Sequence, residues 1–378
     1  NAYRGLPDSS NPDSYTSLEA AKITKTVLNW FNDYPAAIGD FSPARRKRYF
    51  CEAKLKTLQL LYYIQHDLGE SLWSVADDEG YDTPYNREEN LCENIPAEFK
   101  SIERHFPVMP YVREGRRLMG LHTLTAVEIR REGTPPVAVH NFPTSIAIGD
   151  YAVDLHECNA ASTFEVEFEH AGDIPPGFRM GVFQVPLESL IPAELDGFLA
   201  AEKNISQSRL ANGATRLQPI TMLTGQAAGV LAALSVKGRV EPRNVDVEAV
   251  QRVLLVEKST LALPVFPDVP KTHDLWAAVQ MAVSHGWMGP GSKEGFGLTA
   301  PVARGEAAQM LARRAGLTAQ FDPWRLAPGL EAAFADVPLY HRYATDVEAL
   351  CKAGAIGAAG KARQFHPDAP MRREEFRG

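Results

Sequence analysis

Apolar side chains recur at three- and four-residue spacing in several parts of the chain, and each such stretch predicts a helix. The clearest covers Arg45 to Gly69, where residues 53–65 place apolar side chains on one face, as a helix packed on a core requires. A second stretch from about Ile220 to Lys237 is rich in Ala and Gly. Pro219-Ile-Thr221 is a plausible N-cap region for it, and Gly238 marks its end.

Between Met109 and Phe183 the pattern changes to short β-branched runs broken by Gly and Pro. These runs cover residues 121–129, 137–139 and 164–168. Such runs are typical of strands, so we expect a mixed sheet in the middle of the chain.

The remaining pattern divides the chain into three expected parts. One more helix follows Val245-Asp-Val247 to about Glu257, and the apolar, proline-containing segment 261–267 is typical of a linker. We therefore predict an α+β or α/β fold with an all-helical end. The expected parts are helix and loop over 1–105, the mixed sheet and long helix over 106–262, and a helical repeat region over 263–378.

The last of these parts contains an internal repeat. Phe266-Pro-Asp-Val-Pro270 recurs 68 residues later as Phe334-Ala-Asp-Val-Pro338. Each copy continues through a predicted helix closed by glycine, a loop with an aromatic residue (Phe296 or Phe365), and a second helix. The second helices begin at Arg304-Gly-Glu306 and Arg373-Glu-Glu375. An Asp just ahead of a helix accepts its free N–H groups, so Asp268 and Asp336 are expected to cap the helices that follow them.

Composition and charge narrow the possible functions. A chain of 378 residues that is 45% hydrophobic can bury a large core. Its net charge of −8, with no run of five like charges, argues against a nucleic-acid partner or a polybasic membrane anchor. No stretch is apolar enough to predict a transmembrane segment. The chain starts at Asn1 with neither an initiator Met nor a signal peptide, so we expect a processed, trimmed or incomplete chain.

The four cysteines are widely spaced, at Cys51, Cys92, Cys158 and Cys351. Without a CxxC spacing they predict neither a zinc site nor a redox pair, and no other metal site is expected. Buried free thiols are the favoured interpretation. A disulfide stays open, with three possible full pairings.

The chemistry is concentrated in residues 204–229, which read as a polar loop ending in Gly213, then Arg216, Pro219 and a helix whose first turns hold small or flexible residues. A helix N-terminus presents free N–H groups and a partial positive charge, which suits an anionic or electron-rich ligand. The small residues of Gly225-Gln-Ala-Ala-Gly229 would let a ligand or another part of a protein approach the helix closely.

This segment resembles the FAD-dependent oxidoreductases of the fumarate-reductase-like class, in which a Gly-Gln-Ala-Ala-Gly helix points at the flavin ring. The resemblance implies FAD as cofactor, with the helix stabilising negative charge on the reduced ring. It extends over roughly residues 25–257. The further matching segments are 30–35, 111–118, 145–149 with 154–156, and 185–192. The implied cofactor-binding residues are Ser206, Gly213, Arg216, Pro219, Thr221, Gly225, Gln226, Ala227 and Ala228.

Two departures from that family bear on function. The Gly-x-Gly-x-x-Gly turn that seats the dinucleotide is absent from the sequence. A missing N-terminal flavoprotein segment or a partner chain is therefore expected to supply it. Many relatives also carry His and Glu in the loop before the flavin helix, where this chain has Arg209, Leu210 and Asn212.

An acid-base group must then come from elsewhere. His156 is the candidate, because imidazole titrates near neutral pH, with a structural role as the alternative. Arg116, in a cluster with Arg113 and Arg117, is the second catalytic candidate, since a guanidinium can orient a carboxylate or hydroxyl; salt bridges are the alternative for such clusters.

The two-copy repeat resembles the S-layer homology repeat, which begins with Phe-x-Asp-Val and closes on an Arg-x-Glu element. That resemblance implies a helical module that binds bacterial cell-wall polysaccharide. Arg304 and Arg373 occupy the matching Arg positions and are the candidate glycan-binding residues. The alternative is an Arg-carboxylate pair that ties one repeat to the next.

Together the two resemblances imply an extracytoplasmic enzyme at a bacterial cell surface or in the periplasm. It would transfer hydride to or from an organic small molecule, with a sugar or other alcohol as the expected substrate. The competing hypothesis is a non-catalytic wall-binding or assembly subunit on a degenerate flavin scaffold.

Overall fold

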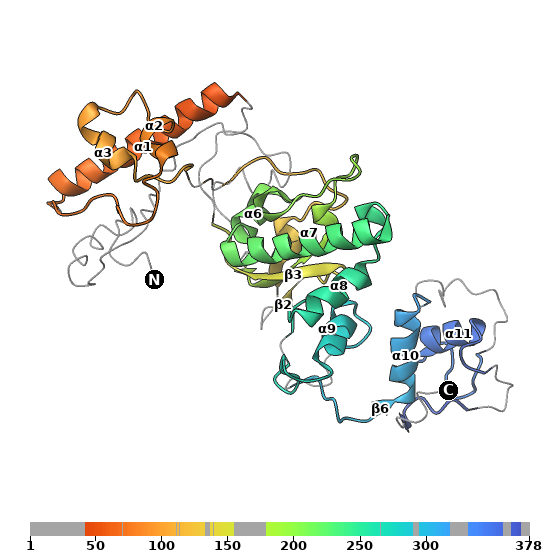
Figure 1. Ribbon diagram of the computed structural model, residues 1–378. Helices are drawn as coiled ribbons and strands as arrows, with labels where there is room; N and C mark the ends of the chain where they lie inside the picture. Colours follow the sequence, from red (N-terminus) through yellow and green to blue (C-terminus); the bar gives the residue numbers. More distant parts are fainter. Residues whose placement is uncertain are drawn as a thin grey trace. The chain divides into compact units, whose positions relative to one another are not determined.

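A computed structural model gives the architecture of the chain (Figure 1). The parts it describes are residues 42–69, 71–110, 112, 114–132, 137–138, 140–154, 179–264, 266–289, 295–317, 332–357 and 364–371. They belong to two compact units, the first within residues 1–116 and 154–163, the second within 117–153 and 164–378. His156, Cys158, Arg373 and the predicted strand 164–168 lie outside the described residues.

The first unit is built on a long helix and a disulfide. Its helices are α1 (Pro43–His66), α2 (Pro84–Glu88), the 3-10 helix η2 (Ala97–Phe99) and α3 (Lys100–Glu103). α1 confirms the helix predicted over 45–69. Cys51 on α1 bonds to Cys92, so the preference for free thiols was wrong for this pair. Cys351 is a free thiol.

A buried ion pair supports the core beside this disulfide. Lys54 contacts Glu103 at 3.5 Å, and both side chains are almost fully buried. Glu103 also accepts the backbone N–H of Cys92 at 2.7 Å and an ammonium hydrogen of Lys100 at 2.9 Å. The apolar part of the same core consists of Leu58, Ile95 and Phe106 together with the disulfide.

The second unit combines small antiparallel sheets with helices. Strands β1 (Arg130–Glu132), β2 (Val137–Ala138) and β4 (Arg179–Met180) form one sheet in the order β2-β1-β4. Strands β3 (Ser145–Asp150) and β5 (Val182–Pro186) form another, with an irregularity between Ser145 and Ala147. Of the predicted strands, 137–139 is confirmed in part by β2. The prediction over 121–129 was wrong, because its last four residues form helix α4 (Ala126–Ile129).

The long apolar helix predicted in the centre is α7 (Gln218–Gly238), which lies across β3 (Figure 1). It packs beside α8 (Val247–Val256), which begins at Asp246, whose side chain accepts the N–H of Glu248. By length and composition α7 could cross a bilayer. Six of its side chains are buried in the folded unit. They are Ile220, Thr221, Thr224, Ala227, Leu231 and Ser235.

Further short elements complete this part of the unit. They are the 3-10 helices η3 (Leu187–Leu190), η4 (Glu202–Asn204) and η5 (Pro242–Asn244), and helix α6 (Arg209–Thr215).

The segment expected to be a linker is fixed where it leaves α8. Leu261 and Ala262 are buried, and their N–H groups both donate to Oε1 of Gln280 at 2.9 Å. The carbonyl of Leu261 accepts from Gln184 and Ser145 on the β3-β5 sheet. Gln280 belongs to α9 (Trp276–Ser284), so the first helix of the repeat region is hydrogen bonded into the same core as the sheet.

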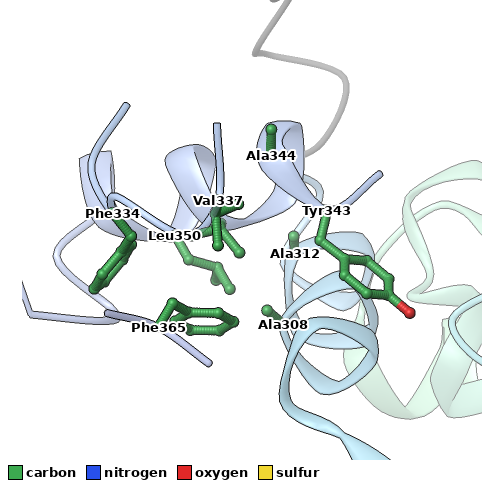
Figure 2. Packing of buried hydrophobic residues seen from close by; sticks show 9 residues of the cluster. Ala308, Ala312, Phe334, Val337, Tyr343, Ala344, Leu350 and Phe365 are labelled. Carbon is green, nitrogen blue, oxygen red and sulfur yellow. The ribbon is translucent and has the colours of Figure 1, made fainter. Parts of the chain in front are cut away.

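The repeat region continues with α10 (Arg304–Arg314), α11 (Ala344–Lys352) and the short strands β6 (Val302–Ala303) and β7 (Pro370–Met371), which pair with each other. Figure 2 shows the core between α10 and α11, where Phe334, Leu350 and Phe365 face Ala308 and Ala312.

The two repeat aspartates do not cap the helices that follow them. Oδ1 and Oδ2 of Asp268 accept the N–H groups of Phe296 and Gly297. Asp336 likewise accepts those of Phe365 and His366. The capping prediction was therefore wrong: each carboxylate holds the aromatic loop of its own repeat.

Candidate functional site

The N-terminus of α7 is the central feature of the candidate site. Its N-cap, Leu217, has no side chain able to accept a hydrogen bond, its first turn contains no acidic residue, and Gln218 and Pro219 are exposed. Thr221, expected near the cap, donates to the carbonyl of Gln218 instead. Neither the N-cap side chain nor an acidic residue of the first turn therefore offsets the partial positive charge at the start of this 21-residue helix.

One face of α7 is open. At Gly225 and Gly229 an added Cβ would meet no described atom within 4 Å. The side chain of Met222 is 73% exposed, and no charged residue occurs from Gln218 to Val236. The face is therefore free of bulky and charged side chains at these positions, as the small-residue pattern predicted.

The other candidate residues on this helix differ in orientation. Ala227 is fully buried in the core, whereas Ala228 is partly exposed. Oε1 of Gln226 accepts from the hydroxyl of Ser259 at 3.2 Å. Of these three, Gln226 and Ala228 are partly exposed and Ala227 is inaccessible to a ligand.

The segment before α7 is a helix, so its interpretation as a polar loop was wrong. α6 is N-capped by Ser208, which accepts the N–H of Ala211 at 3.0 Å. Gly213 is buried inside it, and Arg216 follows at its C-terminus with 2% of its surface exposed. Arg216 is thus held rigidly in the turn between α6 and α7.

Buried amides and hydroxyls line the inner side of this turn. Nε2 of Gln207 donates to Oδ1 of Asn212 at 3.0 Å, and Thr215 donates to Oε1 of Gln207. Nδ2 of Asn212 is buried and has no hydrogen-bond partner among the described residues. An orphaned buried donor costs roughly 1–3 kcal/mol, which indicates an acceptor supplied from outside.

Residues 117–124 run alongside residues 204–208, which lead into α6. Leu124 donates its N–H to the carbonyl of Ser206, and Ser208 donates back to Leu124. The hydroxyls of Thr123 and Ser206 are 2.8 Å apart. Gly120 is required here, because a Cβ would lie 2.6 Å from that of Ser206. The predicted cofactor residue Ser206 is therefore bonded to this neighbouring segment.

The same neighbouring segment carries a pair that the sequence reasoning missed. Nε2 of His122 lies 3.0 Å from Oε1 of Glu128. Glu128 closes a capping box with Thr125 at the start of α4. The motif Thr-x-x-Glu was the sequence signal that could have placed Glu128.

The remaining predicted residues belong to the first compact unit or lie outside the described residues. Arg116 is exposed and belongs to the first compact unit. His156 is not among the described residues, so its candidacy stays a prediction. No group of three or more His, Cys, Asp or Glu with metal-ligand proximity occurs in the described part of the chain.

In the repeat region Arg304 bridges the two repeats. Its Nε donates to the carbonyl of Phe365 at 2.9 Å, and its guanidinium lies 5.2 Å from that ring. The next residue, Gly305, lies against the ring of Tyr343, where a Cβ would be 2.0 Å from a ring carbon. Arg304 thus ties one repeat to the next, through a carbonyl and a ring, where the alternative in the sequence analysis had a carboxylate.

Comparison with known proteins gives one match. A family model described as FAD dependent oxidoreductase matches residues 7–254, which is more than half of the chain. No curated protein and no solved structure matches. The matched range contains α6, α7 and the His122–Glu128 pair.

Proposed function

Because the chain belongs to the family of FAD-dependent oxidoreductases, we propose that the turn between α6 and α7 holds the flavin end of FAD. The family makes the protein an oxidoreductase with FAD as its cofactor. When bound, FAD supplies an acceptor or donor of two electrons in the form of hydride. The family membership favours the enzyme over the wall-binding subunit on a degenerate scaffold.

The residues of the turn fit this cofactor. The uncapped N-terminus of α7 offers N–H donors and partial positive charge to the electron-rich pyrimidine edge of a flavin. Gly225 leaves room for the ring, and the unpartnered Nδ2 of Asn212 offers a further donor. The uncapped, open start of α7 is the observation that carries this proposal.

We assign the other half of FAD to a second polypeptide segment or chain. The sequence lacks the glycine-rich turn that seats a pyrophosphate. The exposed face of α7, with Met222 and Val236 exposed to 73% and 79%, is uncharged and suited to burial against such a partner.

The substrate class in this proposal is an organic small molecule with a hydroxyl group, such as a sugar. The protein acts outside the cytoplasm, at a bacterial surface or in the periplasm. The Cys51–Cys92 disulfide supports an oxidising compartment. The S-layer-like repeats support attachment to wall polysaccharide, where Arg304 joins the repeats and Arg373 is the remaining candidate for glycan contact.

Two variants test the flavin site. Gly225→Leu fills the open face while favouring helix formation, so we expect loss of FAD absorbance between 300 and 550 nm with no loss of stability. Val256→Leu, at a position 72% exposed at the end of α8 and outside the open face of α7, is the control and should keep its FAD. Full retention of FAD by Gly225→Leu would refute this placement. Intact mass analysis of the yellow native material should show the second segment.

A further inference from the structure

A carboxylate close to the candidate flavin turn is fixed in one orientation. Oε2 of Glu128 accepts the N–H of Thr125 at 2.8 Å and the Thr125 hydroxyl at 2.9 Å. The other oxygen, Oε1, lies 3.0 Å from Nε2 of His122. Because α4 begins at this capping box, Glu128 cannot turn away from the histidine without breaking the start of the helix.

The imidazole packs edge to face on the ring of Phe142 at 5.3 Å. The backbone of His122 is fixed as well, because its carbonyl accepts from the hydroxyl of Ser189 at 3.4 Å. Nε2 is buried and lies within ion-pair distance of Oε1 of Glu128, but the geometry of the described residues gives it no hydrogen bond, and the side chain as a whole is 34% exposed. A carboxylate beside Nε2 favours a proton on that nitrogen, which leaves the lone pair of a neutral imidazole on Nδ1.

The pair also lies next to the candidate cofactor residues. His122 precedes Thr123, whose hydroxyl is 2.8 Å from that of Ser206. Ser206 is followed by Gln207, which bonds to the buried Asn212 of α6. One continuous set of contacts therefore joins the pair to the turn that leads into α7.

We propose that His122, oriented by Glu128, is the base that takes the hydroxyl proton of the substrate. The inference rests on the proposed function and deepens it. In the reaction, the substrate O–H bond breaks and its proton goes to Nδ1 of His122, while the C–H bond breaks and its electron pair leaves with the hydrogen as hydride for FAD. A C=O bond forms, so the substrate loses the two electrons that FAD gains. Glu128 is a positioning residue that holds the imidazole in one orientation.

Other charged or titratable groups lie on the elements packed in this part of the unit. The ring of His140 makes a tilted contact with the same Phe142 at 4.2 Å, and the hydroxyl of Thr144 donates to Glu188 at 2.6 Å. Arg117 donates to the carbonyl of Gln207. His140 is exposed and supplies a matched control, because it shares the aromatic partner and has no contact with Glu128 among the described interactions.

The test uses the FAD-loaded holoenzyme in anaerobic single-turnover reduction from pH 5 to 9. The probes are glucose, galactose, xylose and glycerol, and flavin bleaching is the signal. We expect His122→Gln to slow reduction about 100-fold and to remove its pH-dependent step. Added imidazole should restore part of the rate of His122→Ala. Glu128→Gln should slow flavin reduction but keep a pH-dependent step. The rate of flavin reduction in His140→Gln should stay within about twofold of that of the wild type.

A readout independent of turnover is the ring tautomer, measured by nitrogen-15 NMR of histidine-labelled holoenzyme and assigned by loss of the signal in His122→Gln. We expect the proton on Nε2 above pH 8. A proton on Nδ1, or a wild-type rate and pH step in His122→Gln, would overturn the inference and leave the proposed function standing. If no probe reduces wild-type FAD, the proposed substrate class and this inference both fail.

Discussion

Asp268 and Asp336, which occupy equivalent positions 68 residues apart, each clamp two consecutive backbone N–H groups in the aromatic loop of their own repeat. The four distances are 2.9 and 2.8 Å at Asp268 and 2.7 Å twice at Asp336. The clamped loops present Phe296 to Phe266 and Phe365 to Phe334, with ring centroids 5.3 and 5.2 Å apart. Each repeat therefore closes on a carboxylate and an aromatic pair.

This relationship predicts that the repeat region is sensitive to acid. The N–H groups of Phe296 and Gly297 lower the pKa of Asp268. Burial pushes the pKa of Asp336 upward, but its bonds from Phe365 and His366 outweigh that effect and lower it. Because the folded carboxylates have the lower pKa, their contribution is complete above the ordinary value of 3.8 and is lost as the pH falls below it.

Acid unfolding is followed by tryptophan fluorescence between pH 2 and 6. Asp336→Asn should lower stability at neutral pH and flatten the loss below pH 4. An unchanged acid transition in the double variant Asp268→Asn with Asp336→Asn would contradict this account.

Reduction of the Cys51–Cys92 disulfide is expected to destabilise the first unit. The bridge closes a loop over a sequence separation of 41. Loss of that cross-link should cost about 3–4 kcal/mol through the entropy of the unfolded chain. Amide hydrogen exchange of α1 in increasing urea, with and without dithiothreitol, measures the change. Cys351→Ser, which removes the free thiol, should leave the difference intact.

The buried pair of Lys54 and Glu103 should be strongly coupled. Burial lowers the pKa of Lys54, and Glu103 counteracts this by favouring its charged form. Glu103→Gln removes that partner, so we expect a loss of about 3 kcal/mol, of which Lys54→Met in the same chain restores a part. Amide hydrogen exchange of α1 measures both the loss of stability in Glu103→Gln and its partial recovery in the double variant. Lys100→Met, at the half-exposed partner, should cost less than about 1 kcal/mol.

Gln280 should stabilise the connecting segment between α8 and α9. Its Oε1 accepts two buried backbone N–H groups, and Gln280→Ala leaves both without an acceptor. We expect a loss of about 3 kcal/mol in urea unfolding. Gln309→Ala, which removes a single bond to Asp346 between α10 and α11, is the control and should cost less than half as much. Equal effects would mean that the connecting segment has no special role.

Helices with long apolar periodicity could be predicted from the sequence, whereas short elements could not. α1, α7 and α8 lie close to their expected positions, because burial of one face decides such helices. Residues 121–129 misled the prediction: their β-branched content favours a strand, but the capping box of Thr125 and Glu128 starts α4. Local side-chain hydrogen bonds prevailed over strand propensity there.

The sequence predicted the position of the candidate site but not the side chains that surround it. The small residues of α7 predicted an open face, and Gly225 confirms it. The pairing of Cys51 with Cys92 depends on the packing of α1 against a distant loop. His122 and Glu128 are six residues apart, which puts them on different faces of a helix and about 20 Å apart along a strand, so only the fold brings them together.

The buried connecting segment at Leu261 also has a mechanical consequence. Its carbonyl is bonded to Ser145 and Gln184 of the β3-β5 sheet, and its N–H to α9 of the repeat region. Because Leu261 is hydrogen bonded on both sides, a force applied to the repeat region would be transmitted through it to the β3-β5 sheet, which lies beside α7. If the molecule is anchored through its repeats, tension would thus reach α7, the helix whose first turn is proposed to face the cofactor.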